Sequence, residues 1–157
     1  MVLSREVGES VIVVIPTYNE KKSIGVLVEK IFKLGVSNIS IIVVDDNSPD
    51  GTAEIVSSLG QKFPVKLLTR TSKQGLGTAY VFGFREALRI NPTYIIQMDA
   101  DLSHDPRDII RLLDEIKRSD IVLGSRYVEG GSTEDWGVVR AWVSKLGNIY
   151  ARFVLNL

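Results

Sequence analysis

Short apolar runs recur along this chain, and each is too brief to form a helix. They are rich in β-branched residues and apolar at most successive positions instead of at alternate ones. Strands buried on both faces have this pattern, which is typical of parallel sheets. The runs are VIVVI (11–15), ISIIVV (39–44), VKLLT (65–69), YIIQM (94–98) and DIVLG (120–124).

Between the runs, apolar residues repeat at helical spacing, as over residues 24–34 and 109–116. Before the second repeat, Asp105, Pro106 and Asp108 match an N-cap, a proline at the first helical position and a first-turn acid. Strands and helices thus alternate, which predicts an α/β fold with a doubly wound, mostly parallel sheet. Ligands of such sheets bind at the carboxyl ends of the strands.

Composition excludes several classes of function. The chain has 157 residues, enough for one domain, and its 19 basic and 19 acidic residues balance, so no nucleic-acid partner is expected. There is no cysteine, which excludes disulfides, a thiolate nucleophile and cysteine-ligated zinc. The first ten residues lack the apolar core of a signal peptide, and no apolar run reaches the length of a membrane span.

The loops that follow the predicted strands are expected to contain the functional residues. Because the carboxyl ends of parallel strands meet at one edge of a sheet, these loops are expected to share a ligand. Neither a dinucleotide fingerprint nor a Walker motif is present, which argues against NAD chemistry and NTPase activity. The loops are PTYNE (16–20), DDNSPDGT (45–52) and DADLSH (99–104).

Asp99 and Asp101 lie one residue apart, directly after the run at 94–98. Residues spaced in this way can point to the same side, and Mg²⁺ is typically held by one or two carboxylates together with phosphate oxygens. The pair therefore predicts a site for a divalent metal and a diphosphate. The alternative is that one aspartate caps a turn while the other is solvated.

Other polar residues of these loops are candidates with simpler alternatives. The Asp45 carboxylate could accept hydrogen bonds from a base, although its surroundings are rich in turn-forming residues. Tyr18 could pack on a base or ribose, or only cover the core. The Lys73 ammonium group could approach a phosphate, or it could be a solvated loop residue. The Arg126 guanidinium could bind phosphate oxygens, or it could form an ion pair on the surface. His104, the single histidine, is interpreted as a polar loop residue.

Residues 136–157 form a long amphipathic pattern with Trp142 on a broad apolar face and basic residues beside it. Helices that lie at a membrane interface have this character, although packing against a protein core gives a similar pattern. We expect a C-terminal helix here that contacts a membrane surface.

Several motifs, in this order along the chain, resemble family 2 glycosyltransferases of the GT-A fold, and in particular their dolichyl-phosphate mannose synthase branch. The resemblance covers residues 10–157 and implies a Rossmann-like, nucleotide-sugar-binding domain. The motifs are IPTYNE, IIVVDDNSPDGT, KQGLGTAYVFGF, DADLSHDP and GSRYVEGG.

The resemblance implies roles for individual residues. Those that would hold the nucleoside of GDP-mannose are Pro16, Tyr18, Glu20 and Asp45. Those that would hold a divalent metal, Mg²⁺ or Mn²⁺, and the diphosphate are Asp99, Asp101 and Ser103, the last at a position where some members have a glutamine. Lys73 and Ala100 complete the expected substrate-binding set. Arg126 and Arg140 would neutralise the phosphates of donor and acceptor, and they join Asp99 and Asp101 in the expected catalytic set.

The implied reaction transfers mannose with inversion from GDP-mannose to dolichyl or another polyprenyl phosphate. Family members act at the cytoplasmic side of a membrane, and any anchor would lie outside this chain. Their catalytic domains continue for several tens of residues, so residues 1–157 are expected to form the donor-binding part of a single GT-A domain whose acceptor-side remainder is missing.

Two alternatives stay open. The first is a sister enzyme that uses a UDP-sugar, such as UDP-glucose, with a polyprenyl phosphate. The second is a non-catalytic nucleotide-binding α/β module. A receiver-like module is disfavoured because receivers place their acids after the first and third strands, whereas here the acids follow the second and fourth.

Overall fold

The computed structural model describes residues 9–125, 142–144, 146, 147, 149, 150 and 154. The chain divides into two compact units, residues 1–120 and 121–157, and each is considered by itself. Among the described residues, no helix has both the length and the apolarity to cross a bilayer.

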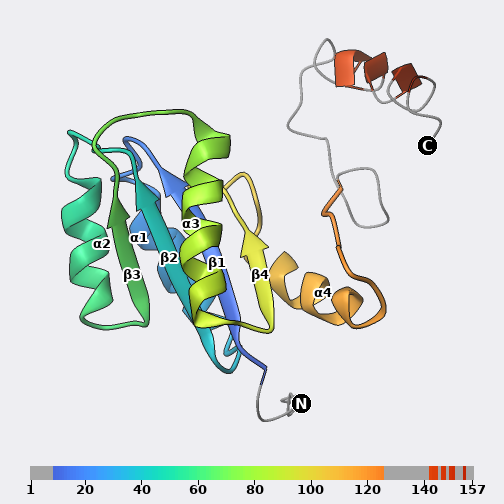
Figure 1. Cartoon of the computed structure of the whole chain (residues 1–157), viewed down its shortest axis with the longest axis horizontal. Coiled ribbons are helices and arrows are strands. Elements are labelled where there is room, and N and C mark those ends of the chain that lie inside the picture. The colour runs from blue at the N-terminus through green and yellow to red at the C-terminus, as the bar shows by residue number, and fades with distance from the viewer. Residues whose placement is uncertain (1–8, 126–141, 145, 148, 151–153, 155–157) are drawn as a thin grey trace. The chain divides into compact units, whose positions relative to one another are not determined.

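The first unit is built on a parallel four-stranded sheet with strand order β3-β2-β1-β4 (Figure 1). The sheet is doubly wound, because β2 and β3 lie on one side of β1 and β4 lies on the other. Its order along the chain alternates strands and helices, as the sequence predicts. The strands are β1 (Val11–Thr17), β2 (Ile39–Asp45), β3 (Val65–Thr69) and β4 (Tyr94–Gln97).

Helices cover both faces of this sheet. One core cluster joins the side chains of one face to three helices, and a second cluster joins the other face to the remaining helix. The helices of the first face are α1 (Ile24–Lys33), α2 (Thr52–Gly60) and α4 (Asp108–Glu115), and the helix of the second face is α3 (Leu76–Ile90); a 3₁₀ turn, η1 (Ile116–Arg118), follows α4.

The two faces explain why the strands are continuously apolar. Along β1, Val11, Val13 and Ile15 belong to the first cluster, while Ile12 and Val14 belong to the second. All of these residues are buried, because successive side chains of a strand point to opposite faces and each face carries helices.

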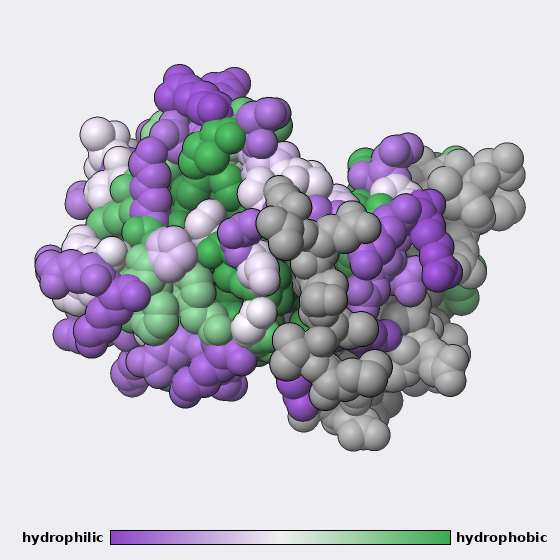
Figure 2. Space-filling model, turned by 90° about the horizontal axis from the view of Figure 1, so that it is seen from below, coloured by the Kyte–Doolittle hydropathy of each residue, from purple (hydrophilic) through white to green (hydrophobic). Residues whose placement is uncertain are grey.

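The register aligns the strands at their carboxyl ends. Thr17 of β1 pairs with Asp45 of β2, which in turn pairs with Thr69 of β3. The loops that follow these strands therefore begin at one edge of the sheet, and the loop after β4 begins beside them. Figure 2 views the opposite edge, where the strands begin, and shows apolar residues exposed among polar ones.

The predicted strand at 120–124 is not formed. Residues 121–125 have no regular secondary structure, and the side chains of Ile121 and Leu123 are exposed. An apolar, β-branched run indicates that burial of its side chains is favourable, but a strand also needs hydrogen bonds to a neighbouring strand. Among the described residues, no strand pairs with residues 121–125.

The start of α4 also differs from the prediction. The helix begins at Asp108 with Arg107 in the N-cap position. The Asp105 carboxylate accepts a hydrogen bond from the backbone N–H of Arg107 at 2.9 Å, so it caps a turn that precedes the helix. The helix expected over 136–157 lies largely outside the described residues; residues 142–144 within that range are helical.

Helix α3 lies unusually close to the sheet at Gly83. A Cβ atom placed on this residue would clash with Cγ1 of Val14 and would lie 3.0 Å from Cγ2 of Val44. Both valines are fully buried strand residues, so neither can move aside easily. The absence of a side chain at Gly83 therefore sets how closely α3 approaches β1 and β2.

We predict that Gly83→Ala lowers the free energy of unfolding by about 1–3 kcal/mol, the usual cost of overpacking a core. Gly77→Ala is the matched control, because Gly77 lies in the same helix and nothing approaches its added Cβ within 4 Å. It should be neutral or stabilising by up to about 1 kcal/mol. Urea denaturation of both variants measures the difference, and equal stabilities would contradict the packing argument.

Candidate functional site

A pocket of about 300 Å³ lies at the carboxyl edge of the sheet. Its wall combines the end of β1 and the loop after it with the loops that follow β2, β3 and β4 and with the start of α3. The lining residues are Pro16, Thr17, Tyr18, Glu20, Asp46, Lys73, Leu76, Ala79, Asp99, Ala100 and Asp101.

The structure brings together most of the residues that the sequence placed in a donor site. The predicted residues in the wall are Pro16, Tyr18, Glu20, Lys73, Asp99, Ala100 and Asp101. Asp45 and Ser103 are absent from the wall. Arg126 and Arg140 lie outside the described residues, so their roles stay predictions.

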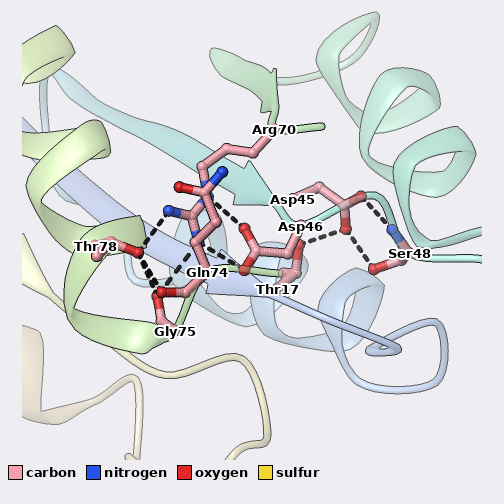
Figure 3. A network of polar contacts seen from close by, with 8 residues as sticks. All are labelled: Thr17, Asp45, Asp46, Ser48, Arg70, Gln74, Gly75 and Thr78. Carbon is pink, nitrogen blue, oxygen red and sulfur yellow. Dashed lines mark hydrogen bonds and ion pairs between the residues drawn. The ribbon is translucent and has the colours of Figure 1, made fainter. Parts of the chain in front are cut away.

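Asp45 is fully buried beside the pocket, where its carboxylate is held by its own chain (Figure 3). Oδ1 accepts hydrogen bonds from the hydroxyls of Thr17 at 2.8 Å and Ser48 at 2.6 Å, and Oδ2 accepts one from the backbone N–H of Ser48 at 2.8 Å. The residue ties the ends of β1 and β2 together and shapes the following loop.

Asp46, one residue later, is the carboxylate that reaches the pocket wall. From the sequence, Asp45 is the residue expected to contact a ligand. Neighbouring residues at a strand end point to opposite sides, so only one of the two carboxylates reaches the pocket. The sequence pattern alone does not tell which one.

Asp46 forms a buried ion pair with Arg70, which directly follows β3 (Figure 3). The guanidinium binds both carboxylate oxygens, with Nη2 to Oδ2 at 2.6 Å, and the two side chains are only 7% and 6% exposed. Such a two-pronged pair fixes orientation as well as distance.

The same guanidinium also reaches the start of α3. Nη1 donates to Oγ1 of Thr78 at 2.7 Å, and Nη2 donates to the carbonyl of Gly75 at 3.3 Å. Arg70 thereby connects the β2 loop to the segment that carries Lys73. Arg70 was not predicted from the sequence; the available signal was a charged residue placed directly after a strand.

Lys73 lies at the pocket beside Tyr18. Its ammonium group is 4.1 Å from the centre of the Tyr18 ring, which is cation–π geometry. This contact links the loop after β1 to the loop before α3. It also places a positive charge in a wall that otherwise carries Glu20 and aspartates.

Asp99 and Asp101 each have a hydrogen-bond donor of their own. The Tyr80 hydroxyl donates to Oδ1 of Asp99 at 2.6 Å, and the backbone N–H of Ser103 donates to Oδ1 of Asp101 at 2.9 Å. The Ser103 backbone and side chain lower the pKa of the Asp101 carboxyl. Burial, together with the bond to Asp99, raises the pKa of the Tyr80 hydroxyl far above its usual value, so this phenol stays protonated as a donor.

These residues could hold a cation together with a ligand. Among the described residues, no group of three or more His, Cys, Asp or Glu side chains is arranged to hold a metal ion. Asp99 and Asp101 supply two carboxylates in one pocket wall. That donor set fits Mg²⁺ or a similar cation, which usually keeps waters and takes phosphate oxygens as further ligands.

His104 lies against Asp99 in the same loop. Its Nδ1 accepts the backbone N–H of Asp99 at 3.3 Å, and its Nε2 is 4.0 Å from Oδ2 of the Asp99 carboxylate. The imidazole is therefore a polar loop residue that packs beside the acid pair, in keeping with the interpretation made from the sequence.

We predict that Arg70→Met lowers the free energy of unfolding by about 3–5 kcal/mol, because it leaves the buried Asp46 carboxylate without its partner. Arg89→Met is the control: Arg89 pairs with Glu86 but its side chain is 78% exposed, so its loss should cost less than about 1 kcal/mol. Urea denaturation compares the two. Similar small losses would show that the Asp46 pair does not hold this edge together.

Comparison with known proteins yields one family. The sequence matches the profile of glycosyl transferase family 2 over residues 12–157. It is 42% identical over 149 residues to a polyprenol monophosphomannose synthase of Mycolicibacterium smegmatis. That match covers 93% of this chain and 56% of the synthase. It is 44% identical over 145 residues to a dolichol-phosphate mannosyltransferase of Pyrococcus furiosus, covering 91% of this chain and 40% of that protein.

The chain therefore spans roughly half of the length of the curated relatives it matches, between 40% and 60%. Among solved structures, it is similar to a mannosyltransferase of Pyrobaculum calidifontis in complex with GDP-Man and Mn²⁺, with a TM-score of 0.57 and 24% identity. That match covers 68% of this chain and 32% of the other, and it supports the fold predicted from the sequence.

Proposed function

Since the chain belongs to glycosyl transferase family 2, we propose that it forms the donor-binding part of an enzyme that transfers mannose from GDP-mannose to dolichyl or another polyprenyl phosphate. The observation that carries this proposal is a single pocket whose wall holds an aromatic ring, a lysine and the Asp99–Asp101 pair. A nucleoside diphosphate sugar needs each of these: a surface for the base, positive charge for the phosphates, and a place for a cation.

The nucleoside end of the donor would lie against Tyr18. Its ring is partly exposed and reaches the pocket, and Asp46 in the same wall offers acceptor oxygens to the N–H groups of a base. Arg70 holds the Asp46 carboxylate in one orientation before any ligand arrives. Such preorganisation lowers the cost of ordering the site on binding.

The diphosphate would lie between Lys73 and the acid pair. Lys73 can exchange its contact with the Tyr18 ring for a phosphate oxygen, because cation–π attraction at a partly exposed site is weak. A divalent cation, Mg²⁺ or Mn²⁺, would supply a Lewis acid that stabilises the departing diphosphate. Asp99 and Asp101 would hold it, and Ser103 keeps Asp101 ionised by donating to it.

The sugar and the acceptor are proposed from the relatives. Proteins 40–44% identical to this chain carry the names polyprenol monophosphomannose synthase, undecaprenyl-phosphate mannosyltransferase and dolichol-phosphate mannosyltransferase. A phosphate monoester acceptor has a second pKa of about 6, so it is already anionic near neutral pH and needs no general base. Charge neutralisation is then the main demand on the acceptor side.

The acceptor side involves residues outside the described part of the chain. Arg126, Arg140 and most of residues 136–157 lie there. We keep as proposals that both arginines contact phosphates, that residues 136–157 meet a membrane surface, and that the whole protein acts at the cytoplasmic side of that membrane.

Calorimetric titration of this chain with GDP-mannose tests the donor site. We expect saturable binding with Mn²⁺ that weakens at least tenfold in EDTA, and weaker binding of UDP-glucose. A preference for UDP-glucose would reassign the donor while keeping the reaction class. Binding of neither nucleotide sugar would overturn the assignment of the pocket.

We predict that Asp101→Asn weakens Mn²⁺-dependent binding of GDP-mannose by about 10–100-fold, because the amide oxygen carries no charge for the cation. Asp101 is exposed, so the unfolding midpoint should change little. Asp120→Asn, another exposed aspartate outside the pocket, is the control and should bind as the parent chain does. Unchanged affinity in Asp101→Asn would remove this residue from the site, as would near-normal transfer by the same variant of the full-length enzyme.

A further inference from the structure

Tyr80 lies next to the pocket and contacts Asp99, one of the acids of its wall. It belongs to the buried face of α3 and is 5% exposed. Its hydroxyl donates a hydrogen bond of 2.6 Å to Oδ1 of Asp99, whose side chain is 35% exposed and belongs to the pocket wall. Neither the sequence motifs nor the proposed donor contacts assign a role to this residue.

The position of the Tyr80 hydroxyl is set by the packing of α3 on the sheet. Gly83, one turn along the helix, allows α3 to approach Val14 and Val44 at van der Waals distance. The Tyr80 ring is also stacked on Phe84, with 5.8 Å between ring centres. The hydroxyl is therefore anchored to the core and not to a loop.

Asp99, by contrast, belongs to a loop. It follows β4, and the next residues include Leu102, whose φ of 64° is rare for a residue with a branched side chain. A carboxylate on such a segment could rotate among several orientations. The bond from Tyr80 occupies one oxygen and fixes the plane of the carboxylate.

The second oxygen of Asp99 is available for a ligand. Among the described residues, the nearest recorded polar group is Nε2 of His104 at 4.0 Å, which is beyond hydrogen-bond distance. Carboxylates that hold metals are typically hydrogen-bonded in this one-sided way by residues of the surrounding shell.

We propose that Tyr80 is a positioning residue of the donor site, which orients Asp99 so that its free carboxylate oxygen can receive the divalent cation that accompanies the donor diphosphate. This inference rests on the proposed function, because it needs a cation to bind at Asp99. It goes beyond that function by assigning the orientation of the acid to a buried phenol on α3.

Mn²⁺ binding in the presence of GDP tests the inference without any transfer assay. Electron paramagnetic resonance reports free Mn²⁺ directly, so its affinity can be measured for the parent chain and for Tyr80→Phe, which keeps the ring and removes only the hydroxyl. We expect Mn²⁺ affinity to fall about tenfold or more. Circular dichroism shows whether the variant is folded.

Tyr94→Phe is the matched control. The Tyr94 hydroxyl donates to Oε1 of Glu9 at 3.2 Å, at the start of β4 instead of at its end. Loss of the same atom there should leave Mn²⁺ affinity unchanged. An equal fall in both tyrosine variants would mean that general destabilisation, and not the orientation of Asp99, weakens the site.

A double-variant comparison gives a readout that a merely structural role would not produce. If Tyr80 acts through Asp99, then adding Tyr80→Phe to Asp99→Asn should weaken Mn²⁺ binding no further. Additive losses would overturn the inference, and so would an unchanged affinity in Tyr80→Phe alone. If the parent chain binds no Mn²⁺ with GDP, the proposed function itself fails, which distinguishes the two failures.

Discussion

Burial of a parallel sheet on both faces is the constraint on which the rest of this structure depends. Every connection between its strands must cross a face, so each strand begins at one edge and ends at the other. The loops after β1, β2 and β4 therefore meet at one edge although they are far apart in the sequence. Helix α3 supports this edge from one face because Gly83 lets it approach the strands closely.

That arrangement places several carboxylates at one edge, and they differ in burial and in their hydrogen-bond donors. Asp45 and Asp46 are buried and receive their hydrogen bonds from neighbouring hydroxyls, a backbone N–H and the Arg70 guanidinium. Asp99 and Asp101 are more exposed, and they are held by the Tyr80 hydroxyl and by Ser103, respectively. Asp45 and Asp46 shape the pocket, where Asp46 is also the proposed contact of the base, and Asp99 and Asp101 keep oxygen atoms available for a cation.

Local pattern in the sequence was enough to predict the β1–β4 strands and the helices α1 and α4, because continuous apolarity and helical spacing indicate burial directly. Several residues of the pocket wall, such as Pro16, Glu20 and Ala100, were expected only from the resemblance to a known family. Local pattern failed where the outcome depended on distant partners. Which of Asp45 and Asp46 faces the pocket depends on contacts with Thr17 and Arg70, and the run at 120–124 has no strand partner among the described residues. Arg70 and Tyr80 contact acids 24 and 19 residues away, which no local pattern encodes.

The central claim is that the acidic edge of this sheet binds a nucleoside diphosphate together with a cation. Anomalous X-ray diffraction from crystals of the chain grown with GDP and Mn²⁺ tests it most directly, because the manganese signal locates the cation independently of the protein. The account predicts a peak bonded to the carboxylates of Asp99 or Asp101 and to the GDP diphosphate, with the base beside Tyr18. Manganese or GDP bound elsewhere, with the acid pair unoccupied, would contradict it.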